Sequence, residues 1–375
     1  MFACQHQRAR DRNKHGYMKK TKIQWCHSSV NPVMGCDGCE LWPGKAKIAA
    51  ELAAAIIAYG EGQSVQDIQK SVSVLIGDWE ASQIYTNRVL LAKKLATHFG
   101  LGKSASAGLV DVIRRACKCY AGLLGTMRAW HSGHADQFEK PKLFPGRMAE
   151  ATRWKYPAAD ELKAKPWLDG APRMIFISDM GDALSASIKN EYLKQEIIET
   201  VASDQGRNHL WLWLTKRPAR MAEFGQWLLA QGILWPDNLV AMTTVTSPAT
   251  TNRVEGLRLV PSRFKGLSCE PVFAELTPDL TDIDWVIMGG GSDTLAEPFH
   301  VEWALSLRER CRNANAAFFL KQLGRNAWFK GQPLNLVDEH GGDWTEWEAN
   351  WKTREIPESF RAQDTLKPKR NGIAV

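Results

Sequence analysis

The feature of this sequence that most restricts its fold is an alternation of short apolar runs and helical stretches from Met174 onward. Stretches of helical character, such as Asn190 to Ala202 and Val301 to Asn313, lie between several of the runs. Alternating strands and helices imply parallel strands joined by right-handed crossovers. Mostly continuous apolar strands are typical of a sheet that is covered on both faces. The apolar runs are residues 174–178, 210–214, 239–243, 264–268, 284–288 and 317–321.

Two earlier runs, residues 22–25 and 138–144, are candidates for further strands. Eight strands would complete a β/α barrel, in which the active site lies at the carboxyl ends of the strands. The sequence therefore predicts an α/β fold with a complete or nearly complete TIM-like barrel over residues 21–330. Residues 1–20 are expected to form a flexible basic arm, and residues 331–375 a C-terminal extension.

A mostly helical insertion is predicted within the barrel sequence, at about residues 44–115. Residues 60–69 are polar and are expected to form a loop inside it. The insertion is interpreted as an elaboration beside the active site, either a lid or inert bulk. Its predicted helices are residues 46–58, 83–99 and 107–116.

The bulk composition is that of a soluble globular protein, with 44% apolar and 24% charged residues in a chain of 375. No apolar run is long enough for a membrane helix, and the polar, basic start does not resemble a secretory signal. A cytoplasmic location is therefore expected, in which cysteines are thiols or ligands rather than disulfides. The formal net charge of +7 favours an anionic partner, although solvated basic ends also explain it.

Polar or small residues follow each predicted strand. The carboxyl ends of parallel strands open on the same face of a barrel, so these residues are expected to lie close together. Loops are often polar without having a function. This explanation suffices for the residues after any single strand, but it accounts less well for polar residues after all of the strands. The residues are Asp179, Asp182, Lys216, Arg217, Pro218, Thr243, Thr244, Thr246, Cys269, Glu270, Pro271, Gly289, Gly290, Gly291, Ser292 and Gln322.

Cysteines form the second pattern that points to chemistry. Cys36 and Cys39 form a Cys-x-x-Cys pair on a tight loop, and Cys117 and Cys119 follow the insertion. Four thiolates would make a tetrahedral zinc site, whereas three thiolates with one open iron position would suit a 4Fe–4S cluster. The spacing alone leaves both possibilities open, beside a redox pair or inert thiols. Buried apolar roles are expected for the scattered cysteines Cys4, Cys26 and Cys311.

Several short motifs together resemble a phage-encoded three-cysteine-motif family of the radical S-adenosylmethionine (SAM) superfamily. The resemblance covers roughly Lys22 to Gly324 and is interrupted by the insertion. The matching motifs are Lys22-Ile23-Gln24-Trp25, Asn31-Pro32 to Gly35-Cys36, Cys119-Tyr120-Ala121, Ser178-Asp179-Met180, Leu214-Thr215-Lys216-Arg217-Pro218, Ser268-Cys269-Glu270-Pro271, Asp284-Trp285-Val286-Ile287 and Phe318-Phe319-Leu320-Lys321-Gln322.

The resemblance implies a 4Fe–4S cluster bound by Cys36, Cys39 and Cys119 at the mouth of a radical SAM barrel. Such a cluster cleaves SAM to methionine and a 5′-deoxyadenosyl radical, with electrons from a donor such as a flavodoxin or ferredoxin. In this sequence the third cysteine is displaced by the insertion, which makes Cys117 a rival to Cys119. The following Tyr120-Ala121 favours Cys119.

The resemblance also suggests roles for the residues at the strand ends. Asp179 and Asp182 would bind the SAM ribose, orient substrate or cap local structure. Lys216 and Arg217 would hold a carboxylate or phosphate, or form outward salt bridges. Gly289 and Gly290 would receive the methionine amino group through backbone carbonyls, although Gly291 replaces the usual acidic residue. Glu270 and Lys321 are expected to pair or to handle protons, and Cys269 is expected to face the same site.

The family context suggests DNA or a modified nucleotide as substrate. The leading hypothesis is isomerisation of an amino-acid-modified thymine from a nitrogen-linked to a carbon-linked form, in the host cytoplasm. The alternatives are radical SAM chemistry on a free nucleotide, a lesion or a peptide, and a zinc-stabilised DNA-binding protein. Near the C-terminus, packing is favoured over base stacking for three tryptophans. These are Trp344, Trp347 and Trp351.

Overall fold

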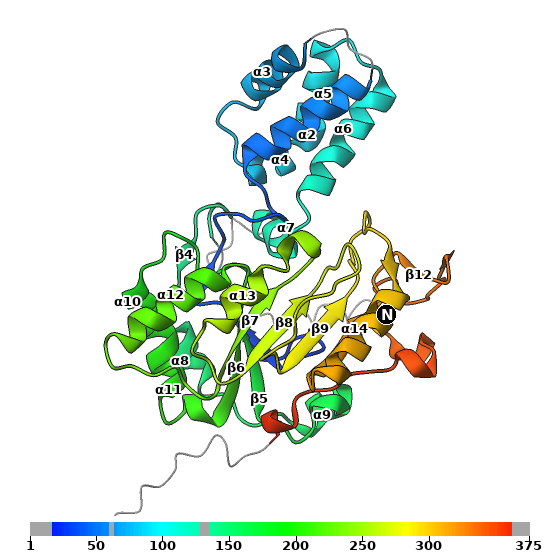
Figure 1. The fold of residues 1–375 in the computed structure, drawn as a ribbon. Helices are drawn as coiled ribbons and strands as arrows, with labels where there is room; N and C mark the ends of the chain where they lie inside the picture. Colours follow the sequence, from blue (N-terminus) through cyan, green and yellow to red (C-terminus); the bar gives the residue numbers. More distant parts are fainter. Residues whose placement is uncertain (1–16, 60–63, 128–134, 362–375) are drawn as a thin grey trace, which may run out of the picture. The chain divides into compact units, whose positions relative to one another are not determined.

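The structure, a computed structural model, describes residues 17–59, 64–127 and 135–361 of the chain (Figure 1). The chain divides into two units, each with its own cluster of buried apolar side chains. We call them the sheet unit and the helical unit. The sheet unit comprises residues 1–32, 144–184 and 188–375, and the helical unit comprises residues 33–143 and 185–187.

A parallel half-barrel forms the centre of the sheet unit. Its strands follow the order β1-β2-β5-β6-β7-β8-β9-β11, and all run parallel except β1, which pairs antiparallel with β2 at one edge. Figure 1 shows β5 to β9 side by side in this order. The strands are β1 (Tyr17–Met18), β2 (Ser28–Val30), β5 (Arg173–Ile177), β6 (His209–Thr215), β7 (Leu239–Thr244), β8 (Lys265–Cys269), β9 (Trp285–Gly289) and β11 (Ala317–Gln322).

The strands from β5 to β11 confirm the six apolar runs predicted from the sequence, with bounds that differ by one residue at most. The two earlier predictions are wrong. Residues 22–25 form a turn, because Lys165 Nζ donates to the carbonyls of Thr21, Ile23 and Cys26 at 2.5–2.8 Å, and the strand starts only at Ser28. Of residues 138–144, only β4 (Lys142–Leu143) is extended, and it pairs with β3 (Val33–Met34) in the helical unit.

The far edge of the sheet is covered by the C-terminal segment. The N–H of Leu320 donates to Thr353 O at 2.8 Å, and the N–H of Glu355 donates to Phe318 O at 3.0 Å. Residues 353–355 therefore take the position that a further strand would occupy beside β11. In the described ranges no strand pairing joins β11 to β1 or β2, so the complete barrel expected from the sequence is not formed.

A buried arginine attaches this segment to β11. Arg354 donates to the carbonyl oxygens of Leu320 and Lys321, and its guanidinium lies 4.2 Å from the ring centre of Trp167. The rings of Trp344 and Trp347 also lie within about 5 Å of it, a distance typical of cation–π contacts. Burial lowers the pKa of Arg354 to about 10. The tryptophans therefore pack within the sheet unit, as the sequence favoured.

Side chains alternate between two faces of the sheet, because successive residues of a strand point in opposite directions. Met174, Leu212, Ile287 and Phe319 belong to one buried cluster, which we call the inner face. On the other face, which we call the outer face, Trp213 packs against Phe224 of helix α12, with ring centres 5.9 Å apart. Both faces are apolar, as expected for a covered parallel sheet.

Helices and short strands complete the sheet unit. Helix α12 begins with Pro218 at its first position, where the missing N–H leaves no hydrogen bond unmade. The predicted helix at residues 190–202 is continuous but contains a π-helical turn. The elements are α8 (Arg147–Ala151), α9 (Ala159–Ala164), η1 (Pro166–Leu168), α10 (Asn190–Leu193), η2 (Lys194–Ile198), α11 (Glu199–Ala202), η3 (Gly206–Asn208), α12 (Pro218–Leu229), η4 (Pro248–Thr250), α13 (Arg253–Arg258), β10 (Phe299–His300), α14 (Val301–Asn313), β12 (Ala327–Phe329), β13 (Gln332–Pro333), η5 (Trp344–Glu346), η6 (Ala349–Trp351) and η7 (Glu358–Phe360).

The helical unit consists of helices packed around its own apolar cluster. Most of the helices predicted for the insertion are present, but the predicted helix at 83–99 is divided at Asn87 into two helices. A further helix, α3, begins at Val65, within the segment predicted as a loop, and the Ser64 side chain caps it by accepting from Asp67 N. The helices are α2 (Lys45–Ala58), α3 (Val65–Ile76), α4 (Ala81–Thr86), α5 (Arg88–His98), α6 (Lys103–Ala116) and α7 (Tyr120–Met127).

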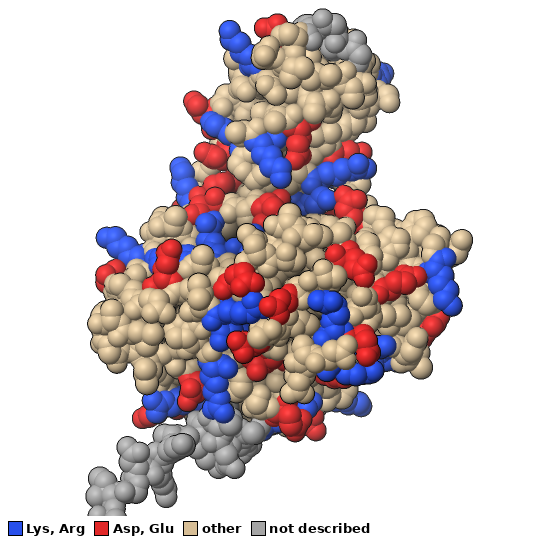
Figure 2. Space-filling view, viewed as in Figure 1, with Lys and Arg blue, Asp and Glu red and all other residues tan. Residues whose placement is uncertain are grey.

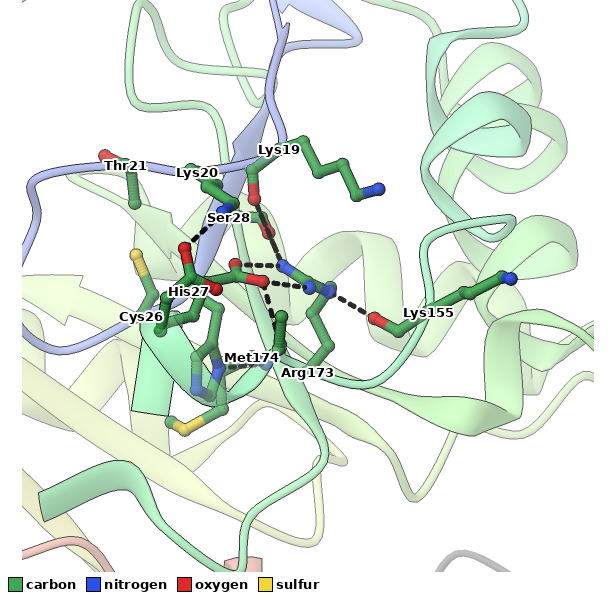
Figure 3. A network of polar contacts seen from close by, with 12 residues as sticks. Lys19, Lys20, Thr21, Cys26, His27, Ser28, Lys155, Arg173 and Met174 are labelled. Carbon is green, nitrogen blue, oxygen red and sulfur yellow. Dashed lines mark hydrogen bonds and ion pairs between the residues drawn. The ribbon is translucent and has the colours of Figure 1, made fainter. Parts of the chain in front are cut away.

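A buried ion pair fixes the amino-terminal end of the sheet (Figure 3). Arg173, at the start of β5, donates to both carboxylate oxygens of Glu161 at 3.0 Å, and also to Ser28 Oγ and to the carbonyls of Lys19 and Lys155. Burial alone would raise the pKa of Glu161, but the hydrogen bonds from Arg173 and from Ala158 N lower it. The guanidinium thus joins the start of β5 to two other segments, residues 19–28 and 155–161.

We predict that Arg173→Met destabilises the chain by about 3–5 kcal/mol, because it leaves the Glu161 carboxylate buried without its partner. Lys20→Met is the matched control, since the Lys20–Asp160 pair is 58% and 70% exposed and should contribute little. Urea unfolding followed by circular dichroism measures both. Equal small effects for the two variants would show that the buried pair does not stabilise the sheet.

Candidate functional site

The Cys-x-x-Cys loop follows β3 directly and is attached to the chain near Phe138. Cys36 N donates to Phe138 O at 2.8 Å. Gly35 has a φ of +89°, and a Cβ at this position would lie only 2.6 Å from Phe138 O. Gly38, before the second cysteine, also has a positive φ, of +101°. The loop shape that presents Cys36 and Cys39 therefore requires glycine before each of them.

The segment that carries Cys119 is hydrogen-bonded to the same loop. The N–H groups of Lys118 and Cys119 both donate to the carbonyl oxygen of Leu41, at 2.9 and 2.8 Å. Leu41 lies two residues after Cys39, which itself bonds to Trp42 through both backbone groups. Helices α2 to α6 separate these cysteines in sequence, yet the backbone brings them to one loop.

Helix α7 starts directly after Cys119 and packs on the loop. Gly122 N donates to Cys119 Sγ at 3.4 Å, so the sulfur lies at the amino-terminal end of the helix. A Cβ at Gly122 would lie 2.4 Å from the Trp42 ring. A glycine three residues after a cysteine was the sequence signal for this close approach, and our sequence analysis did not use it.

A carboxylate fixes the other side of the loop. Glu139 Oε1 accepts from Trp42 Nε1 and from Ser82 N, both at 2.8 Å, and Glu139 Oε2 accepts from Ser82 Oγ at 2.7 Å. The Trp42 ring meets Phe138 edge to face, with ring centres 5.4 Å apart. Sequence reasoning missed Trp42 and Glu139, because their pairing spans the whole insertion and leaves no local pattern.

The two rival cysteines differ in exposure. Cys117 is 1% exposed and belongs to the apolar core of the helical unit, where burial raises the pKa of its thiol to about 12. Cys119 is half-buried, its own N–H donates to Leu41 O, and it directly precedes helix α7, whereas Cys36, at 9% exposure, lies in the same apolar core as Cys117. The arrangement favours Cys119 over Cys117 as a partner of Cys36 and Cys39.

The backbone brings Cys36, Cys39 and Cys119 to one loop, but their side chains do not meet in this structure. Among the described residues, no three His, Cys, Asp or Glu side chains are placed so that they could hold a metal ion. A three-thiolate site therefore requires Cys36, Cys39 and Cys119 to move from the side-chain positions that they occupy here. The short backbone link between the segments and the half-exposure of Cys39 and Cys119 are compatible with such a movement.

Asp179, at the carboxyl end of β5, is held by groups from β2 and the residue after it. Its carboxylate accepts from Asn31 Nδ2 at 2.5 Å and from Ser29 Oγ at 3.2 Å, while Asn31 Oδ1 accepts from Met180 N. Burial raises the pKa of Asp179, and the two hydrogen bonds oppose this shift. The neighbouring Ser178 has a φ of +72° and a buried Oγ that bonds to none of the described residues. Sequence reasoning did not assign Ser29 or Asn31 to this site.

Asp182 stabilises the turn after β6. Its carboxylate accepts from Thr215 Oγ1 at 2.9 Å and from Lys216 N at 3.1 Å. The Arg217 side chain approaches Asp182 at 4.0 Å, and Arg217 N donates to Thr215 Oγ1. Asp182, Lys216 and Arg217 are therefore together at one strand end, as predicted, and the structure gives Asp182 a capping role.

Cys269 does not face the strand-end residues, in contrast to our expectation. Ser268 pairs with Ile287 of the inner face, so Cys269, the next residue, points to the outer face. It is 0% exposed, and burial raises the pKa of its thiol, with Cys311 of α14 adding to the shift. Cys269 is a core residue between the sheet and α14.

The glycines after β9 pack closely against the end of β11. A Cβ at Gly290 would lie 2.3 Å from Leu323 O. The carbonyls of Gly289 and Gly290 already accept hydrogen bonds from Val272 N at 3.1 Å and from Gln322 Nε2 at 2.9 Å. Backbone packing thus explains the glycines, and each carbonyl retains one further lone pair for a ligand.

Glu270 and Lys321 form an ion pair at the carboxyl ends of β8 and β11. Both side chains are 17% exposed, so neither charge is fully removed from water. The pairing was one of the two possibilities that the sequence left open. The other possibility was a role in proton handling.

The surface charge is mixed. Figure 2 shows acidic and basic side chains interspersed on the face that it draws. Much of the basic character noted in the sequence falls at residues 8–16 and 367–370, outside the described ranges, as does Cys4. In the residues that the structure describes, no helix combines the length and the apolar character needed to cross a bilayer.

The fold and the cysteine loop define an α/β protein with a parallel half-barrel and a helical unit that carries a Cys-x-x-Cys motif. More particularly, the chain belongs to the family described as "Protein of unknown function (DUF5131)", whose family model matches residues 107–363. The match includes Cys119 and the strands from β5 onward, whereas Cys36 and Cys39 precede it. No curated protein and no solved structure matches the chain.

We predict that iodoacetamide modifies Cys39 and Cys119 in the folded, metal-free chain but not Cys26 or Cys269. The latter two are 0% exposed, and their raised thiol pKa values further reduce the reactive thiolate at mildly alkaline pH. Peptide mapping by mass spectrometry measures the labelling before and after unfolding in urea. Fast labelling of Cys269 in the folded chain would contradict the buried position.

Asp179→Asn should become more stabilising, relative to the native chain, as the pH rises from about 4 to about 7. The folded pKa of Asp179 lies above the ordinary value of 3.8, so the folded chain loses stability as this carboxyl ionises. Asp160→Asn is the matched control, because the hydrogen bond from Lys20 lowers the pKa of this exposed carboxyl, which is then ionised in both the folded and the unfolded chain across this range and should give almost no slope. Urea midpoints across this pH range test the two slopes, and parallel slopes would refute the prediction.

Proposed function

We propose that this chain is a radical SAM enzyme whose 4Fe–4S cluster is bound by Cys36, Cys39 and Cys119. The observation that carries the proposal is the pair of hydrogen bonds from Lys118 and Cys119 to Leu41 O, which join the third cysteine to the Cys-x-x-Cys loop. Cys117 is more deeply buried than the other three cysteines, at 1% exposure against 9% for Cys36, and this favours three thiolates over a zinc site with four.

When bound, the cluster would supply the electron that cleaves SAM to methionine and a 5′-deoxyadenosyl radical. The chain's own contribution is to bind and orient. The hydrogen bond from Gly122 N at the start of α7 orients the sulfur of Cys119, and the Glu139–Trp42 hydrogen bond keeps the loop in place. Three cysteine thiolates leave one iron without a protein ligand, which is the position that a SAM enzyme requires.

In the sheet unit, we assign the SAM contacts from the family resemblance. Asp179, oriented by Asn31 and Ser29, would accept hydrogen bonds from ribose hydroxyls. Asp182 would act indirectly, by fixing the turn that carries Lys216 and Arg217, whose cationic side chains suit a carboxylate or phosphate. Gly289 and Gly290 would offer the remaining lone pairs of their carbonyls to an ammonium group.

For the substrate, we propose a base in DNA, with an amino-acid-modified thymine as the leading candidate for a nitrogen-to-carbon isomerisation. The support is the family resemblance and the net charge of +7. A flavodoxin or ferredoxin would provide the electrons. Incubation of the reconstituted protein with DNA that carries this base tests the proposal, and SAM cleavage without any change of the base would reject this substrate.

We predict that Cys36→Ala and Cys119→Ala each lose most of the bound iron, whereas Cys117→Ala keeps it. The reason is that Cys117 is a core residue, while Cys119 belongs to the loop. Each variant is purified and reconstituted without oxygen. We then measure the bound iron, the visible absorbance of the cluster, and the 5′-deoxyadenosine that forms after dithionite reduction with SAM.

The same set of variants distinguishes the radical SAM proposal from the zinc alternative. Colourless wild-type protein with one bound zinc and no SAM cleavage would refute the radical SAM proposal. Equal loss of metal in Cys117→Ala and Cys119→Ala would favour a four-thiolate site. Cys311→Ala serves as a control for a buried cysteine outside the helical unit.

A further inference from the structure

A cavity of about 320 Å³ lies between helix α14, the start of strand β11 and the C-terminal segment. Arg308 and Arg312 line it from α14, Phe318 lines it from β11, and Asn350 and Glu355 line it from the C-terminal segment. The strand-end residues described above lie at the carboxyl ends of the parallel strands, whereas this cavity lies at the amino-terminal end of β11. It is therefore a separate feature of the sheet unit.

The size and the lining of the cavity suit a small polar solute. At about 30 Å³ for each molecule of liquid water, a volume of about 320 Å³ holds about ten waters. This is more than an inorganic phosphate ion fills, and it lies at the lower end of the range for small-molecule sites, roughly 300–1,000 Å³. The aromatic side chain in the lining, Phe318, is 2% exposed, so it offers no open ring face on which a base could stack.

The two arginines of the lining retain donors for a ligand. They are four residues apart on α14 and therefore share one face of the helix. Arg308 Nη1 donates to Asn350 O and, at 3.2 Å, to Thr353 Oγ1, whereas its buried Nε and its Nη2 bond to none of the described residues. Arg312 Nη1 pairs with Glu309 at 3.0 Å, but these side chains are 70% and 55% exposed. Because such an exposed pair is weak, Arg312 is available to a ligand.

One carboxylate belongs to the same lining. Glu355 Oε2 accepts from Phe318 N at 3.1 Å, and its Oε1 accepts from none of the residues that the structure describes. Within the same part of the chain, Glu355 forms no ion pair with Arg308 or Arg312, so the opposite charges do not close the cavity. The lining thus offers cationic donors from α14 and a single anionic acceptor from the C-terminal segment.

We infer that this cavity binds a small phosphomonoester that carries hydroxyl groups, such as a sugar phosphate. The guanidinium groups of Arg308 and Arg312 donate to the phosphate oxygens, which match the planar fork of arginine donors. Glu355 Oε1 accepts from a hydroxyl group of the sugar. Inorganic phosphate gains nothing from Glu355 and is repelled by it, and a neutral sugar leaves both guanidinium groups without an anion. The inference does not rest on the proposed function, since it requires neither iron nor SAM.

The test measures the binding of ribose 5-phosphate to the full-length, metal-free chain by isothermal titration calorimetry. We expect saturable binding, at least about tenfold tighter than that of inorganic phosphate or of ribose, because only the ester satisfies both the arginines and the carboxylate. Arg312→Met should weaken the binding of the ester about tenfold, because it removes charge-assisted hydrogen bonds. Its melting temperature shows whether this variant has folded.

Two further variants separate the role of each charge. Glu355→Gln should reduce the preference for the ester over inorganic phosphate, because it removes the repulsion of the ion and weakens the acceptor for the hydroxyl group. Glu309→Gln is the matched control, because it breaks the same exposed pair as Arg312→Met but keeps both arginines. This control should bind ribose 5-phosphate at least as tightly as the native chain does.

Three results would overturn the inference. The first is a native chain that binds the ester no more tightly than inorganic phosphate or ribose, and the second is unchanged binding of the ester by folded Arg312→Met. The third is loss of binding in Lys216→Met, which would place the phosphate at the carboxyl ends of the strands. Short single-stranded DNA that displaces ribose 5-phosphate at a lower concentration would assign the arginines to a phosphodiester backbone and would likewise reject a sugar phosphate as the ligand.

Discussion

The carbonyl oxygen of Leu41 is the contact on which the candidate metal loop depends. It accepts the N–H groups of Lys118 and Cys119, and so closes a chain segment that contains most of the helical unit. Closing so long a segment has an entropic cost that grows only slowly with length. The packing of α2 to α6 around one apolar cluster offsets this cost and delivers Cys119 to the loop. The insertion therefore positions Cys119 beside the Cys-x-x-Cys loop.

The strands of the sheet could be predicted because their signal is local. Runs such as 239–244 are buried on both faces, and continuous apolar residues indicate this directly. The short strands near the N-terminus could not be predicted, since β2 has only three residues and depends on partners such as Arg173. The candidate site was also predictable only where its signal is local. Cys36 and Cys39 follow from a motif, whereas Glu139 and Asn31 act through contacts with residues far along the chain.

Hydrogen-bond satisfaction separates the strand-end residues into two groups. Asp182 and the Gly290 carbonyl already bond to their own turns and side chains, because buried polar atoms need partners. Glu270 and Lys321 are only partly satisfied and remain accessible. From sequence position alone, both groups were equally good candidates for a functional role, since all of these residues lie at strand ends. The distinction arises from the partners that the folded chain places beside each group, and these partners are distant in sequence.

The C-terminal segment beside β11 also has a consequence for solubility. An uncovered parallel strand presents a row of backbone donors and acceptors, which invites pairing with another chain. Residues 353–355 occupy this row, and the Arg354 guanidinium between Trp167 and Trp344 holds them there. A chain shortened before Thr353 would keep the whole sheet but expose its last edge. The segment therefore acts as a built-in barrier against edge-to-edge aggregation.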